Sequence, residues 1–167
     1  MKKSAVALAA LLAAGFLQGC ESIDGGSRDQ QGVSVTRLHL GQEIARGEIR
    51  VESVDPAQAS SLDFAQVGGR VERELTRLGW RVTPANPRSE QVAVVRFSQM
   101  GGGETAVSEL NVRIQRRSDA TVAWEGRAQL QGLPPASPAE RGALVDRLTE
   151  AMFRDFPGES GRTIRVR

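Results

Sequence analysis

What this chain lacks excludes several kinds of chemistry. It has no tyrosine, one cysteine (Cys20) and one histidine (His39), and its only lysines are Lys2 and Lys3. A structural zinc site needs about four cysteine or histidine ligands, and a Ser-His-Asp relay would depend on His39 alone. No Gly-x-Ser-x-Gly segment is present, and the glycine run at 101–103 lacks the Gly-Lys-Ser/Thr of a phosphate-binding loop. We therefore expect a flexible loop at 101–103, and no metal, cofactor or nucleophilic active site.

A basic excess is also missing from the main part of the chain. Without Lys2 and Lys3 the 22 basic residues become 20 arginines, which equal the 20 acidic residues. A nucleic-acid surface needs a basic excess on one face, and binding to anionic lipid needs a cluster of basic residues. We expect no nucleic-acid partner, and any attachment to a membrane must depend on something other than charge.

The N-terminus has the pattern of a secretory signal. Lys2 and Lys3 precede an uncharged run of 14 residues, Ser4 to Leu17, which is shorter than the roughly 20 residues that a membrane-spanning helix requires. The run ends in Leu17-Gln18-Gly19-Cys20, which resembles the lipobox of bacterial lipoproteins. That resemblance implies cleavage before Cys20 and acyl chains on it, and two or more chains hold a protein stably on a bilayer.

The rest of the chain divides into a tether and one domain. Residues 1–19 are predicted to be the signal peptide, 20–33 a polar tether that follows lipidated Cys20, and 34–167 a single domain. By resemblance to lipoproteins of two-membrane bacteria, Glu21 after the cysteine favours the outer membrane, with the domain facing the periplasm. The predicted partner is thus the membrane itself, reached through the acyl chains on Cys20.

Hydrophobic periodicity predicts an α+β fold with a mixed, mostly antiparallel sheet and two helices packed on one face. Alternating or continuously apolar runs predict strands at 35–40, 48–54, 80–82, 92–97, 110–115, 122–130 and 163–166. Helical spacing from Leu62 ends at Gly79, and Ser137 caps a second helix that ends before Phe156. Alternation places His39 beside Arg37 and opposite Leu38 and Leu40, in a solvated or edge position.

Two features of composition bear on the packing. Aromatic residues make up 4% of the chain, so the core is expected to consist of Val, Leu, Ile and Ala. Gly68 and Gly69 fall inside the first predicted helix, where each costs about 1 kcal/mol relative to alanine. Close packing of this helix against the sheet is the expected compensation.

Four segments carry a family likeness. Residues 36–41, 74–80, 108–110 and above all Phe153-Arg154-Asp155-Phe156-Pro157-Gly158-Glu159-Ser160-Gly161 resemble a family of Gram-negative envelope lipoproteins whose domain is of unknown function (number four-one-three-six in the unknown-function series). The likeness covers the predicted domain. It implies a lipid-anchored, periplasm-facing α/β domain, and it implies no activity.

The predicted sheet leaves one face free of helices, and this face is the candidate surface for a partner protein or the cell wall. Its charged residues are expected to be Glu48, Arg50, Glu52, Glu109, Arg113, Glu125 and Arg127. An alternative is an envelope glycan hydrolase, which would need two carboxylates roughly 5 to 9.5 Å apart. Glu48 with Glu52, or Glu109 with Glu125, are the available pairs. Edge-to-edge self-association, a third possibility, requires a long uncovered apolar edge strand.

Overall fold

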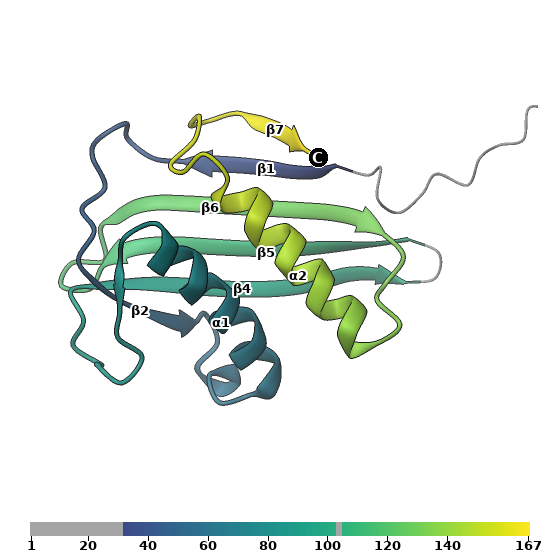
Figure 1. Cartoon of the computed structure of the whole chain (residues 1–167), viewed down its shortest axis with the longest axis horizontal. Coiled ribbons are helices and arrows are strands. Elements are labelled where there is room, and N and C mark those ends of the chain that lie inside the picture. Colours follow the sequence, from purple (N-terminus) through teal and green to yellow (C-terminus); the bar gives the residue numbers. More distant parts are fainter. Residues whose placement is uncertain (1–31, 103–104) are drawn as a thin grey trace, which may run out of the picture.

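The structure, a computed structural model, describes residues 32–102 and 105–167. The predicted signal, lipobox and most of the tether lie outside them. Within the described residues, seven strands form one sheet in the order β3–β2–β4–β5–β6–β1–β7, with two helices on one face (Figure 1). The strands are β1 Val33–Leu38, β2 Glu48–Ser53, β3 Arg81–Val82, β4 Gln91–Gly102, β5 Thr105–Arg116, β6 Val122–Gly132 and β7 Thr163–Val166. The fold is α+β, as predicted.

Pairing in the sheet is mostly antiparallel. β4, β5, β6, β1 and β7 pair antiparallel in succession, whereas β2 pairs parallel with both β3 and β4. The parallel pair follows from the chain path, since α1 carries the chain from the end of β2 back to the start of β3. The described chain starts at the same end of the sheet as the β4–β5 hairpin tip (Figure 1).

Each helix begins at the residue that the sequence predicts. α1 spans Leu62–Arg77, and the Ser61 hydroxyl accepts a hydrogen bond from the Phe64 N–H. α2 spans Pro138–Phe153, and the Ser137 hydroxyl accepts from the Glu140 N–H. These caps satisfy N–H groups that the first turn of a helix leaves unpaired. Gly79 follows α1 with a φ of 99°, a left-handed conformation that glycine adopts without steric cost.

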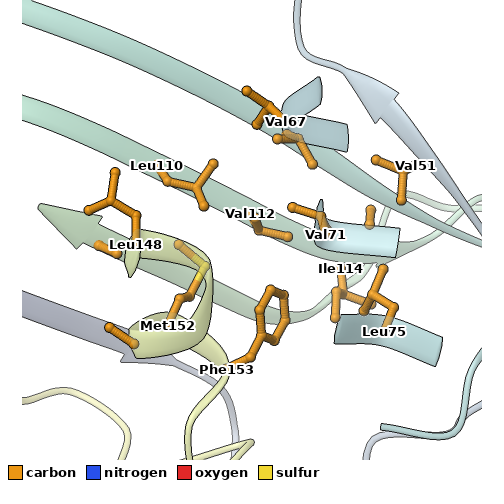
Figure 2. Packing of buried hydrophobic residues seen from close by; sticks show 14 of the residues in the cluster. Val51, Val67, Val71, Leu75, Leu110, Val112, Ile114, Leu148, Met152 and Phe153 are labelled. Atoms are coloured by element: carbon orange, nitrogen blue, oxygen red, sulfur yellow. The ribbon is translucent and has the colours of Figure 1, made fainter. Parts of the chain in front are cut away.

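The core lies between the helices and one face of the sheet. Figure 2 shows side chains from α1 and α2 pointing at the aliphatic residues of the central strands. On the helices these are Val67, Val71, Leu75, Leu148, Met152 and Phe153, and on the strands Val51, Leu110, Val112 and Ile114, all at most 8% exposed. A helical stripe and an alternating strand face thus meet, as their periodicities predict.

Aromatic residues contribute more to the core than the composition suggests. Trp124 is fully buried and stacks on Phe153 with ring centroids 5.4 Å apart, and Phe156 contacts the rings of Trp80, Trp124 and Phe153. Such ring pairs contribute about 0.5–1.5 kcal/mol beyond the area they bury. The expectation of a purely aliphatic core is therefore wrong at the end of the sheet where α2 finishes.

Three local predictions also need correction. The domain begins one residue earlier than predicted, because Val33 already belongs to β1. Gly101 and Gly102 lie within β4, since β4 runs on to pair with β5 almost to the turn. At Gly69 an added Cβ would meet nothing within 4 Å, so packing against the sheet does not account for this glycine.

Candidate functional site

The sheet face opposite the helices carries the charged residues named from the sequence. Glu48, Arg50 and Glu52 alternate along β2, Glu109 and Arg113 lie on β5, and Glu125 and Arg127 lie on β6. All seven are partly or fully exposed, while their neighbours in each strand face the helices. The structure therefore brings the predicted set together on one open surface, which we call the polar face.

Ion pairs and amide hydrogen bonds organise the polar face. Glu48 lies 3.0 Å from an Arg81 guanidinium nitrogen, and Glu52 lies 2.8 Å from one of Arg117. At the centre of the sheet the Asn111 amide donates to Glu125 at 3.0 Å and the Gln129 amide donates to Glu109 at 2.6 Å. Exposed pairs of this kind contribute up to about 1 kcal/mol each. They fix side-chain positions more than they add stability.

Arg113 occupies the centre of this face. It lies opposite Glu125 in the register between β5 and β6, and its Nε is buried without a hydrogen-bond partner. A shallow hollow of about 220 Å³ surrounds it, lined in part by Arg96, Glu109, Asn111 and Arg127. Planar guanidinium groups held in this way present donors that fit carboxylates.

Neither proposed carboxylate pair forms a glycosidase-like cleft. Glu48 and Glu52 are four residues apart on one strand, about 13 Å along the backbone, and each is engaged by a different arginine. Glu109 lies opposite Gln129, and Glu125 opposite Arg113, so the Asn111–Arg127 pair stands between the two glutamates. The hollow there is smaller than the roughly 300–1,000 Å³ of typical ligand pockets.

The prediction that the Arg37 side of β1 faces solvent is wrong. Arg37 is 3% exposed, whereas Leu38 and Leu40 are 51% and 82% exposed. Arg37 continues the inward set of Val33 and Val35, which points toward the helices. The alternation correctly groups the residues into two sides of the strand. The charge of Arg37 suggests that its side faces solvent, whereas that side is the buried one.

Arg37 binds the C-terminal end of α2. Its Nε donates to the Met152 carbonyl at 2.9 Å, and its Nη2 donates to the carbonyls of Ala151 and Arg154 at 3.0 and 2.9 Å. These are carbonyls of the last helical turn, which lack partners within the helix and carry partial negative charge. Burial lowers the pKa of the Arg37 guanidinium, an effect that Asp155 opposes. The arrangement is a buried cap on the helix, which we call the Arg37 cap.

The segment 154–161 wraps over the Arg37 cap. Gly158 lies so close to the Arg37 side chain that an added Cβ would meet its Cδ at 2.6 Å. The Gly41 N–H donates to Nδ1 of His39, so Nε2 carries the proton and donates to the Gly158 carbonyl at 3.0 Å. Ser160 also exchanges hydrogen bonds with the His39 backbone. His39 is thus half-buried and has a structural role.

Sequence reasoning missed this contact, although a signal for it was present. Two of the four family-like segments, 36–41 and 153–161, are far apart in the chain and meet here. Side chains of the two segments contact each other across the fold. These contacts tie β1 to the end of α2.

The described part of the chain contains neither a cluster of metal-binding side chains nor a membrane-spanning helix. Residues 32–102 and 105–167 contain no group of three or more His, Cys, Asp or Glu side chains that could hold a metal ion. No helix among them is both long and apolar enough to cross a bilayer. The two outermost strands of the described sheet are short: β3 has two residues and β7 has four.

Comparisons with known proteins place the fold and leave the family open. No family model matches the chain, so membership of the lipoprotein family named above stays a prediction. An uncharacterised protein of Zymomonas mobilis is 40% identical over 58 residues, which are 35% of this chain and 22% of that protein. The chain therefore matches about a fifth of the length of this curated relative.

Solved structures resemble the domain at low sequence identity. A PDZ domain protein from Parabacteroides distasonis superimposes with a TM-score of 0.56 and 12% identity, over 83% of this chain and 40% of that one. The described domain therefore shares its fold with part of the Parabacteroides protein. The PelC dodecamer of Paraburkholderia phytofirmans resembles the domain more weakly, with a TM-score of 0.47 and 14% identity over 70% of this chain and 91% of that one. Lipoprotein GNA1162 of Neisseria meningitidis gives a TM-score of 0.37 and 12% identity over 60% of this chain and 93% of that one.

Proposed function

We propose that this protein is a lipid-anchored envelope lipoprotein that faces the periplasm and acts by binding a partner, without catalysis. The observation that carries the anchor is the Leu17-Gln18-Gly19-Cys20 sequence after a short apolar run. Glu21 favours the outer membrane. The described residues begin at Gly32, so about a dozen residues of sequence separate them from Cys20.

The polar face supports a binding role. Its arginines and carboxylates are spread over β2, β5 and β6, with β4 between β2 and β5, and its hollow is shallow. A protein or cell-wall partner with complementary charges could cover such a surface, whereas hydrolysis of a glycan requires a cleft with two suitably spaced carboxylates. Arg113 is the expected centre of the contact, because it lies in the hollow of the polar face among Glu109, Glu125 and Arg127.

Lipidation is tested at the cysteine itself. Cys20→Ser removes the sulfur that would carry the lipid, so the variant should keep its signal uncleaved and incorporate no labelled palmitate in cells. Ser22→Ala, two residues away, is the matched control and should mature and label like the parent. A Cys20→Ser protein that is matured and enters detergent like the parent would refute the anchor.

The binding role is tested by photo-crosslinking in intact cells. A photoreactive amino acid is placed at Arg113 on the polar face, and a control is placed at Arg73, an exposed position of α1 on the other side. One defined envelope protein or cell-wall fragment should be captured from Arg113 and not from Arg73. Capture of only a second copy of the chain, or equal capture from both positions, would contradict the proposal.

A further inference from the structure

The outer edge of β4 is only half covered. β2 pairs with Gln91–Val95, and β4 then continues to Gly102 without a neighbour on that side. The Val54 N–H donates to the Val95 carbonyl, and the Arg117 N–H donates to the Glu90 carbonyl. Backbone N–H and C=O groups alternate in direction along a strand. In β4 the N–H and C=O groups of odd-numbered residues therefore point to the outer edge, and those of even-numbered residues point to β5.

Phe97 and Gln99 therefore present their N–H and C=O groups at an open edge. No backbone partner on that side is recorded for them in the described part of the chain. The edge is open because the chain leaves the sheet at Asp55-Pro56 to enter α1. An unpaired strand edge is a template for another extended backbone.

A groove of mixed lining lies beside this open edge, with polar and charged residues (among them Asp55, Asp63 and Arg96) around a smaller apolar part. Its volume is about 440 Å³, and its lining includes Phe64 and Val67 of α1, Phe97 of β4, and Arg141 of α2. The Arg141 guanidinium lies 5.4 Å from the centre of the Phe97 ring and 3.2 Å from Asp63. The groove falls within the size range of ligand pockets and is on the helix side of the sheet, so it can receive one apolar side chain of an added strand.

The other side of the same edge carries a positive charge. Arg96 is exposed and lines both the groove and the hollow of the polar face, and within residues 32–102 and 105–167 it forms no ion pair. Successive side chains of an added strand would point alternately into the groove and toward Arg96. Charge complementarity therefore favours acidic residues at the positions of the added strand that point toward Arg96.

We propose that residues 96–102 of β4 bind an extended peptide segment of a partner protein as an additional strand, with alternating apolar and acidic side chains. Main-chain hydrogen bonds to Phe97 and Gln99 give the affinity, and the groove and Arg96 give the specificity. This inference rests on the proposed binding role and assigns it a second, independent surface.

The test uses the purified full-length chain and a defined probe. The probe is a fluorescent hexapeptide of alternating glutamate and leucine, and the control is one of alternating lysine and leucine. Fluorescence anisotropy should show binding of the acidic peptide at least tenfold tighter than that of the basic one. This measurement needs neither lipidation nor a cell, so its failure is distinguishable from failure of the proposed anchor or of the polar-face crosslink.

Matched variants at Gln99 separate backbone pairing from other contacts. Gln99→Pro removes an N–H that points to the open edge, and proline is tolerated at such positions because the β4–β5 ladder does not use that group. Gln99→Ala keeps the N–H, and both variants lose the same side-chain hydrogen bond to Ser108. Peptide binding should weaken at least tenfold in Gln99→Pro and stay within twofold of the parent in Gln99→Ala.

Amide hydrogen exchange gives a readout that needs no variant. Saturating acidic peptide should slow exchange of the Phe97 and Gln99 amides at least tenfold and leave the Ser98 amide, which faces β5, unchanged. No binding of the acidic peptide, equal binding to Gln99→Pro, or no protection at Phe97 and Gln99 would each overturn the proposal. So would a dimer that Gln99→Pro abolishes, because the occupant would then be a second copy.

Discussion

Loss of the Arg37 cap is expected to lower the free energy of unfolding substantially. Arg37→Met keeps most of the side-chain volume but removes three charge-assisted hydrogen bonds to the last turn of α2. A hydrogen bond to a charged group contributes about 1.5–3 kcal/mol, and losses at neighbouring groups add incompletely. The carbonyls left behind are buried, so we expect the free energy of unfolding to fall by about 3–5 kcal/mol.

Urea unfolding measures this loss directly. Tryptophan fluorescence is a suitable signal, since Trp124 stacks on Phe153 beside the Arg37 cap. At roughly 3 °C per kcal/mol for a domain of this size, the melting temperature should drop by roughly 10–15 °C. Arg37→Lys should recover only part of the loss, because one ammonium group cannot reproduce the fork of donors.

Arg73→Met is the matched control for this substitution. Arg73 is exposed on α1, and its one recorded ion pair, with Asp146, is 3.7 Å long. Its replacement should change the free energy of unfolding by less than about 0.5 kcal/mol. If Arg37→Met were within 1 kcal/mol of the parent by the same assay (about the precision of such extrapolations), the interpretation of Arg37 as a structural cap would be refuted.

Two further substitutions test other details of α1. Gly69→Ala should stabilise the protein by about 1 kcal/mol in urea unfolding, because the added Cβ meets nothing within 4 Å and alanine favours the helix; a destabilised variant would contradict this. Burial raises the pKa of Glu72, so its contribution to stability grows as the pH falls through the folded-state value and is lost as the pH rises through it. At pH 7 the Glu72→Gln variant should therefore unfold at a higher urea concentration than the parent. Below the ordinary glutamate pKa the two proteins should unfold at the same urea concentration. A gap between the two urea midpoints that widens toward acid would contradict this prediction.

Much of the fold follows from local pattern in the sequence. Period two with one polar side marks β2, β5 and β6, and helical spacing with serine caps marks α1 and α2. The same alternation is enough to assemble the polar face, because residues two apart in a strand share a side of the sheet whatever the strand order. The seven charged residues could be named without a structure for that reason.

The sequence alone determined the two sides of each strand and the starts of both helices. The tertiary structure decided which contacts those elements make. Arg37 is buried because the C-terminus of α2 supplies the carbonyls that satisfy it, and these are more than a hundred residues away in the chain. The open edge of β4 exists because β2 ends seven residues before β4 does in their shared register. Both depend on strand pairing between distant segments, which no local pattern of residues encodes.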